Sequence, residues 1–464
     1  MSDHDKESAV IVNSHTSATP LASATPLGKI IKLITSRLAL SVGAQAMVSG
    51  FHFALNLLLL RLVTPYEYGV FAFAFVMAMF ASAVNNALVS TPLTVYTPII
   101  EDECERQQQE AMFSTLNLLL FALLIFAGTA YAISSDLPSS IGIGVTVFIA
   151  VYSARHYSRS TGYARMRPLI TASGDGTYVL SGIMLVAVIF LTTEKLSTGH
   201  VLMALAGANL FAMLVERLRL HGFRKRWLIL SRVSSYSHVW EQSRWALIGS
   251  LTTLFLAQAH SVIITSTNGP NAYAPLAAGF VLFGPVRVAL LTWQNMVKPE
   301  LAVDLSKSRQ VAVRQQIRTT SLAMVSAVAA LALCLWLGWP WIHEFLYAEQ
   351  YSDQPMALIV GLWSIITLFA ASYNAPSAAL QAMRDFRVLA MASIYGAMIS
   401  GILVSITLYL YKPETTLLGI LAAELFMALH LTFTLYSRLS TQPVSTVEIH
   451  ETVPSATATH KSAS

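Results

Sequence analysis

Long apolar runs are the feature of this sequence that most restricts its fold. Twelve segments hold the ~18 or more mostly apolar residues that a helix needs to cross a bilayer. Only 11% of the 464 residues are charged, whereas a soluble protein carries about 25%. Backbone groups in lipid must be hydrogen-bonded within their own segment, which favours helices. We therefore predict an all-α polytopic membrane protein with about 12 transmembrane helices. The predicted spans are 38–60, 68–97, 111–133, 140–163, 171–192, 199–216, 244–266, 272–297, 318–339, 356–382, 388–411 and 415–437.

An internal repeat divides these spans into two halves. The turn Pro65-Tyr-Glu67-Tyr68-Gly69 follows the first span, and a related turn, Gly269-Pro270, follows the seventh. Met166-Arg167 and Tyr178 recur as Met383-Arg384 and Tyr395 at a constant separation. Such a repeat predicts two pseudo-symmetric six-helix bundles. We expect a disordered tail (1–30), an N-terminal bundle (31–217), a basic linker (218–243), a C-terminal bundle (244–438) and a second disordered tail (439–464).

Basic residues predict the orientation of the chain. The connections on one side hold most of the Lys and Arg residues, while those on the other side hold only Arg61, Lys195 and Lys412. By the positive-inside rule, both termini are expected in the cytoplasm. The outer loops are short and no Walker A sequence is present, so we expect no catalytic domain, no internal ATPase and no cofactor. Cys104 and Cys334 have neither disulfide nor metal-ligand spacing.

Polar residues form stripes along three predicted spans. Gln45, Ser49, His52 and Asn56 share one face of the first span. Further stripes include Asn86 and Ser90 in the second span, and Asn374 and Gln381 in the tenth. Such residues either line a water-filled cavity or join helices through hydrogen bonds, and the sequence leaves both possibilities open. His52 is either a proton carrier or a neutral, hydrogen-bonded core residue.

Charged residues within the spans are candidates for function, because each costs about 2.5–3.5 kcal/mol at mid-bilayer. Arg287 lies well inside the eighth span, with Gln294 further along the same face. Its alternative role is an ion pair with Glu424, the deepest carboxylate that the sequence indicates. We expect no deep carboxylate in the first half. The repeat draws Arg155 and Arg159 into the membrane, although both could also extend to the cytoplasmic interface.

The sequence resembles the Wzx-like polysaccharide flippases of the multidrug/oligosaccharidyl-lipid/polysaccharide (MOP) exporter superfamily. The resemblance rests on Asn56, Arg61, the turn from Pro65 to Gly69, Gly269-Pro270, and the ends of the fourth and tenth spans. It implies a bacterial inner-membrane protein that moves undecaprenyl-diphosphate-linked sugars to the outer leaflet by alternating access. The implied partners are this lipid-linked oligosaccharide, membrane lipids, and the polysaccharide polymerase and export machinery; no nucleic acid is implied.

The chemistry of such a substrate suggests roles for the polar residues. Arg287, Arg155 and Arg159 would bind the diphosphate, because arginine pairs with phosphate bidentately and keeps its charge. The polar stripes would face sugar hydroxyls, and His52 or Glu424 would couple transport to an ion. The alternatives are a MATE-like antiporter of drugs or metabolites, a membrane glycosyltransferase, ligase or polymerase, and a non-transporting scaffold.

Overall fold

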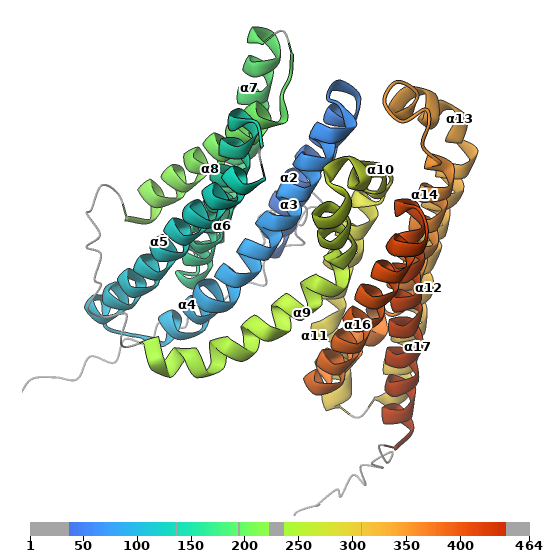
Figure 1. Ribbon diagram of the computed structural model, residues 1–464. Helices are drawn as coiled ribbons and strands as arrows, with labels where there is room; N and C mark the ends of the chain where they lie inside the picture. Colours follow the sequence, from blue (N-terminus) through green and yellow to red (C-terminus); the bar gives the residue numbers. More distant parts are fainter. Residues whose placement is uncertain (1–36, 136, 194, 222–235, 308, 442–464) are drawn as a thin grey trace, which may run out of the picture.

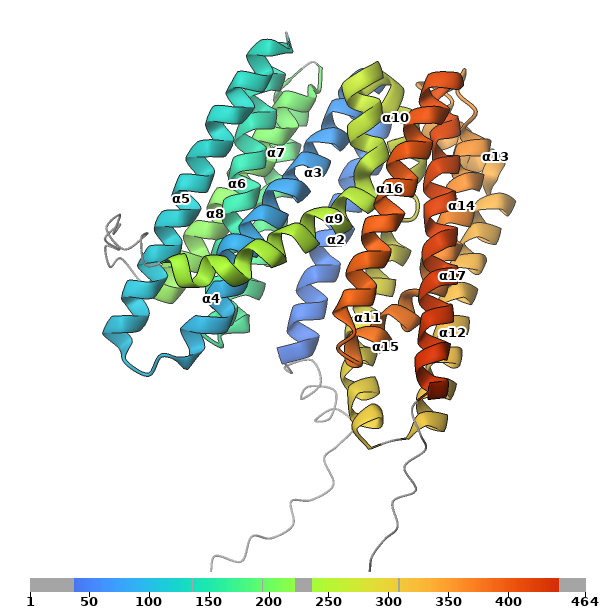
Figure 2. The ribbon, with the colours of Figure 1, turned by 60° about the horizontal axis from the view of Figure 1, so that its bottom comes forward.

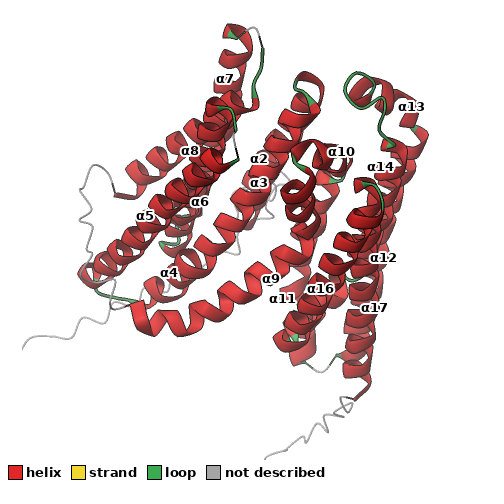
Figure 3. Cartoon of the chain, viewed as in Figure 1, coloured by secondary structure: helices red, strands yellow, loops and turns green. Residues whose placement is uncertain are grey.

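The computed structural model describes residues 37–135, 137–193, 195–221, 236–307 and 309–441. These residues form helices and short connections without any strand (Figure 3). The predicted tail 1–30 lies outside the described residues, as do 222–235 of the linker and 442–464 of the second tail. Helices extend into both ends of the predicted linker, since α8 ends at His221 and α9 begins at Ser237.

The first half comprises α2 (Arg37–Leu62), α3 (Pro65–Asn85), η1 (Asn86–Ser90), α4 (Thr91–Tyr96), η2 (Thr97–Ile99), α5 (Glu103–Ser134), α6 (Ser139–Ala164), α7 (Pro168–Thr192) and α8 (Thr198–His221). The second half comprises α9 (Ser237–Asn268), α10 (Pro270–Val281), α11 (Gly284–Ser306), α12 (Gln310–Leu337), α13 (Trp339–Ile342), η4 (His343–Tyr347), α14 (Met356–Ser372), α15 (Asn374–Ala382), α16 (Phe386–Leu410), η5 (Pro413–Thr416) and α17 (Leu417–Thr441).

These helices account for all twelve predicted spans and confirm the all-α membrane fold. Ten of the described helices are long and apolar enough to cross a membrane, and α10 with α11 makes an eleventh span bent by 61°. The remaining span is α6, whose second half contains Arg155, His156 and Arg159 and is therefore less apolar. The tenth predicted span is interrupted at Tyr373, between α14 and α15.

Local sequence explains where the first repeat turn becomes a helix. Pro65 occupies the first turn of α3, where its missing N–H leaves no helical hydrogen bond unmade. The Thr64 side chain accepts a hydrogen bond from the Glu67 amide at 3.4 Å and so caps the helix. The other end of α3 widens into the π-helix η1, a feature common at functional sites.

The helices gather into two lobes that stand side by side (Figures 1 and 2). We call α2–α8 the N-lobe and α9–α17 the C-lobe. In the N-lobe α6 packs against α5, α8 and α3, and in the C-lobe α17 packs against α14 and α16. Both repeat turns lie at one end, here named the turn end, whereas α2 begins and α17 ends at the opposite end (Figure 2).

Helix α9 joins the two lobes. It packs along α16 in the C-lobe, and it also contacts α3 and η1 in the N-lobe. The Tyr236 hydroxyl, immediately before α9, donates a hydrogen bond of 2.5 Å to the Leu88 carbonyl. The first helix of the second half is therefore anchored on the first half.

Matching hydrogen bonds support the internal repeat at the turn end. The Tyr68 hydroxyl donates to Asn56 Oδ1 at 3.4 Å, and the Ser261 hydroxyl donates to the Tyr273 oxygen at 3.0 Å. Both pairs link residues twelve positions apart, and both connect the helix before the turn to the helix after it.

The repeat at the opposite end is one residue out of the predicted register. Shortly after α6 ends in the N-lobe, Met166 adopts a left-handed backbone conformation (φ 56°). After α15 in the C-lobe, the residue in this conformation is Arg384 (φ 61°) and not Met383. The following amides, of Arg167 and Asp385, close the same type of cap at 2.9 and 3.0 Å. Arg155 therefore corresponds to Tyr373 instead of Ser372. Arg159 likewise corresponds to Ser377 instead of Pro376.

Candidate functional site

At the turn end the two lobes meet without a gap. Gly69 of α3 faces the Pro270 carbonyl, which would lie 2.0 Å from a Cβ at this position. The Arg61 guanidinium of α2 lies 4.3 Å from the centre of the Phe345 ring of η4. Four buried tyrosines belong to the same region: Tyr68, Tyr273, Tyr347 and Tyr351. This end is therefore closed by contacts between the lobes.

A buried ion-pair cluster crosses the N-lobe between α6 and α7. Asp175 is only 1% exposed and accepts from Arg155 at 2.6 Å and from Arg159 at 2.9 Å. Arg155 also donates to Asn209 of α8 at 3.2 Å. The expectation that the first half lacks a deep carboxylate is therefore wrong. The signal that could have revealed Asp175 is an acidic residue between two glycines, Gly174 and Gly176, within an apolar run.

Glu216 of α8 is a second deep carboxylate that the sequence analysis missed. Its side chain is fully buried, and within the described residues neither oxygen has a hydrogen bond of ordinary geometry, although Ser158 lies close enough to interact with it. Gly174 makes room for it, since a Cβ there would lie 2.0 Å from Glu216 Oε1. The Arg155 charge lies within electrostatic range. The N-lobe therefore holds two carboxylates and two arginines in one buried region.

The two arginines of this cluster differ in their access to solvent. The Arg155 side chain is 7% exposed and lies 4.5 Å from the centre of the Tyr178 ring. The Arg159 side chain is 24% exposed. Both guanidinium groups point to Asp175 and are held by it. Arg155 therefore acts inside the lobe, whereas Arg159 can also reach a ligand.

The polar stripe on α2 is divided between two environments. His52 Nε2 lies 2.9 Å from the Tyr178 hydroxyl, and Asn56 bonds both the His52 carbonyl at 2.7 Å and Tyr68. These two residues join helices of the N-lobe. Gln45 is exposed and donates to Ser49 at 3.5 Å, so the stripe is accessible only towards the opposite end.

Arg287 is on α11 in the C-lobe, apart from the N-lobe cluster. Its side chain is exposed, and its guanidinium lies 4.4 Å from the centre of the Phe280 ring. No ion pair with Glu424 is present among the described residues; Glu424 instead accepts from the Tyr373 hydroxyl at 2.8 Å. Arg287 is thus an exposed cation that makes no direct ion pair among the described residues, although the Glu424 charge lies within its electrostatic range.

The remaining candidate residues lie at the surface or between helices. Asn86 is exposed and accepts from Thr91 at 3.4 Å, whereas Ser90 is buried and donates to Asn85 at 3.1 Å. Gln294 and Asn374 are half-buried, and Gln381 donates to Ser377 at 3.3 Å. Among the described residues, no three His, Cys, Asp or Glu side chains are grouped so that they could hold a metal ion.

Comparison with known proteins identifies the fold. No protein-family model and no curated protein sequence matches the chain. Among solved structures, the lipid II flippase MurJ in an inward closed conformation is similar with a TM-score of 0.62 at 13% identity, over 85% of this chain and 86% of that one. An inward-facing multidrug resistance MATE family transporter of the MOP superfamily has a TM-score of 0.60 at 13% identity, covering 89% and 97%. An outward-facing structure of such a transporter has a TM-score of 0.54 at 12% identity, covering 87% and 95%. The chain therefore has the fold that MurJ and the MATE transporters share.

Proposed function

We propose that this protein is a flippase that moves a polyprenyl-diphosphate-linked oligosaccharide across the bacterial inner membrane for exopolysaccharide, capsule or O-antigen synthesis. The observation that carries the proposal is Arg287, an exposed cation in a predicted membrane span that forms no direct ion pair with a carboxylate among the described residues. A charge in this environment is unfavourable unless it has a partner or a ligand. The two phosphates of a polyprenyl diphosphate would supply that ligand.

The surroundings of Arg287 suit a phosphate better than a cation. The Phe280 ring beneath the guanidinium orients it and leaves its N–H groups free to form a bidentate pair with phosphate oxygens. Glu424 lies within electrostatic range of Arg287 but accepts a hydrogen bond from Tyr373 and forms no direct ion pair with the guanidinium. Arginine keeps its charge in a low-dielectric cavity, which suits a site that binds and releases an anion.

The N-lobe would offer a second cation to the same ligand. Arg159 remains partly exposed although it pairs with Asp175, so one side of its guanidinium is accessible. Arg155 would act indirectly: its ion pair fixes the Asp175 carboxylate, and this carboxylate orients Arg159. In this proposal the diphosphate is held between Arg287 of one lobe and Arg159 of the other, and sugar hydroxyls face Gln45, Ser49 and Gln294.

Alternating access would follow from the closed turn end. The Lys/Arg distribution assigns this end to the outside, so the structure would represent an inward-facing state. Substrate would enter from the cytoplasmic leaflet with its tail remaining in lipid. Separation of Gly69 from Pro270 would then open the outer side. His52 and Glu424 remain candidates for ion coupling, to which the buried Glu216 is added.

The test measures binding of undecaprenyl diphosphate to the purified protein and its translocation in proteoliposomes. Loss of one charge-assisted contact of about 1.5–3 kcal/mol predicts at least tenfold weaker binding for Arg287→Ala. Arg287→Lys should recover only part of the affinity, since lysine lacks the planar fork. Arg318→Ala, which removes an exposed arginine from α12, is the matched control. Unchanged binding by Arg287→Ala would place the diphosphate elsewhere.

The buried carboxylates favour one alternative function, a MATE-like antiporter for cationic drugs or metabolites. Asp175 and Glu216 provide negative charge in the N-lobe, but Arg155 and Arg159 lie beside them and compensate it. We therefore rank this function second. Export of a cationic dye from proteoliposomes, abolished by Glu216→Gln and unaffected by Arg287→Ala, would favour the antiporter over the flippase.

A further inference from the structure

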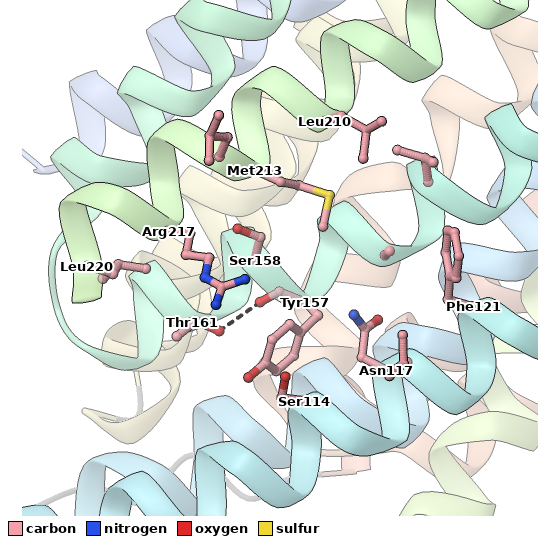
Figure 4. A pocket seen from close by; sticks show the side chains of 14 residues that line it. Ser114, Asn117, Phe121, Tyr157, Ser158, Thr161, Leu210, Met213, Arg217 and Leu220 are labelled. Carbon is pink, nitrogen blue, oxygen red and sulfur yellow. Dashed lines mark hydrogen bonds between the residues drawn. The ribbon is translucent and has the colours of Figure 1, made fainter. Parts of the chain in front are cut away.

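The N-lobe contains a groove that is lined by residues of this lobe alone (Figure 4). Its floor is α6, and its walls are α5 and α8. The cavity has a volume of about 580 Å³, within the range of about 300–1,000 Å³ that is typical of ligand sites. Leu118 is 45% exposed, and Leu210 and Leu214 are each 51% exposed. The groove therefore opens sideways, toward the position of the surrounding lipid.

The two ends of this groove differ in polarity. Arg217, Ser158, Thr161 and Ser114 gather towards one end, whereas Phe121 and Leu210 lie towards the other (Figure 4). Arg217 is four residues before the end of α8, about 6 Å along the helix axis from His221. That depth corresponds to the headgroup level of the leaflet at the opposite end, where arginine side chains are common.

Arg217 is available for a ligand at this level. Its side chain is exposed, and no carboxylate forms an ion pair with it in the part of the chain that the structure describes. Ser158, on α6, places a hydroxyl in the same end of the groove, where it also lies within reach of the buried Glu216 carboxylate. A guanidinium beside hydroxyl groups is a suitable arrangement for a phosphate ester.

The C-lobe contains a comparable cavity that serves as an internal comparison. It lies between α12, α14 and α17, the counterparts of α5, α6 and α8, and has a volume of about 600 Å³. Its lining includes Leu368, Leu425 and Phe433, and its only polar residues are Ser372 and Thr432. The internal repeat therefore gives each lobe a groove of similar volume. Of these two grooves, the one in the N-lobe is lined by a basic residue, Arg217, and the one in the C-lobe is not.

We propose that the N-lobe groove binds one anionic phospholipid of the adjacent leaflet. The phosphate pairs with Arg217 near Ser158 and Ser114, and one acyl chain lies along Leu118, Phe121 and Leu210. The floor residue Ala154 precedes Arg155, and Ser158 precedes Arg159, so the bound lipid would pack on the face of α6 that adjoins the ion-pair cluster. This lipid is a resident of the protein and is independent of the proposed substrate.

Native mass spectrometry of the detergent-purified protein tests this proposal with phosphatidylglycerol and phosphatidylcholine of identical chains. The wild type should retain one phosphatidylglycerol with about tenfold preference over phosphatidylcholine. Arg217→Gln should remove this preference, and Arg217→Lys should keep part of it. Arg219→Ala, which removes an exposed arginine of α8 outside the groove, should leave it unchanged. Leu210→Trp, which fills the apolar end, should lower the binding of both lipids.

Three outcomes would overturn the assignment. Equal losses in Arg217→Gln and Arg219→Ala would show a general attraction of anionic lipid to the basic end of α8. Retention of phosphatidylglycerol by Leu210→Trp would place the lipid outside the groove. Displacement of phosphatidylglycerol by an equal concentration of undecaprenyl phosphate would assign the groove to the substrate tail instead. The first two outcomes do not depend on whether the protein transports a lipid-linked sugar.

Discussion

Asp175 shows why the site could be predicted only in part. The internal repeat indicated that Arg155 and Arg159 lie within the membrane, although the sequence also allowed both to extend to the cytoplasmic interface. Their partner lies on the next helix, at a distance that depends on how α6 and α7 pack. Periodicity places a residue on a face of its own helix but does not determine which neighbouring helix covers that face. The choice of Arg287 as a charge in a span remains a prediction, and only the structure shows that Glu424 accepts a hydrogen bond from Tyr373 and makes no direct ion pair with Arg287.

Removal of the Asp175 carboxylate should destabilise the N-lobe strongly. Asp175→Asn leaves the buried Arg155 without its counter-charge, which typically costs about 3–5 kcal/mol. We expect a clear fall in the thermal unfolding temperature of the detergent-purified variant. The double variant Arg155→Met with Asp175→Leu should regain part of the stability, because it removes the buried Arg155 charge together with its counter-charge, while Arg159 lacks Asp175 in both variants. A single variant as stable as the wild type would contradict a structural ion pair.

At the scale of the helices, the lengths of the apolar segments predicted nearly all of the long helices that the structure contains. A helix covers each of the twelve predicted spans, and all but α6 are apolar enough to cross a membrane, because the bilayer requirement fixes both their length and their hydrogen bonding. The break at Tyr373 and the one-residue shift of the second repeat were not predicted. Both depend on local backbone geometry. Arg384, for example, has a positive φ, which residues other than glycine rarely adopt and which the sequence therefore does not predict.

The contact between α7 and α8 depends on a glycine. Gly174→Ala should force Glu216 away, since the new Cβ would lie 2.0 Å from its carboxylate oxygen. We expect lower stability in thermal unfolding, and a partial rescue when Glu216→Ala is added to the same chain. The two changes form a double-mutant cycle, and a coupling energy near zero would show that the residues do not touch.

For the whole molecule, the contact between the repeat turns determines which side is closed. Gly69→Ala should push Pro270 away and separate the lobes at the turn end. Spin labels on α3 and α10 should report a longer distance in this variant. Gly249→Ala is the matched control, since no atom lies within 4 Å of a Cβ at this position in α9. An unchanged distance in Gly69→Ala would show that the lobes adjust locally without separating.

The orientation of the chain gives a further prediction at this scale. In a variant with Cys104 and Cys334 replaced by serine, a cysteine at Ser139 should react with an impermeant reagent from outside. A cysteine at Lys307 should react only after the membrane is opened, because the Lys/Arg distribution places this connection inside. Reaction of both positions from one side would refute the predicted topology.

The anchoring of α9 has a consequence for the covalent continuity of the polypeptide. Tyr236 bonds to Leu88, and α9 packs on α3 and η1, so the first helix of the second half carries its own attachment to the first half. The contact of α3 with α10 provides another attachment at the far end. The covalent link between His221 and Tyr236 then contributes less to holding the two halves together than these noncovalent contacts do. Two separately translated fragments, divided within this segment, should find each other in the membrane and assemble as a heterodimer.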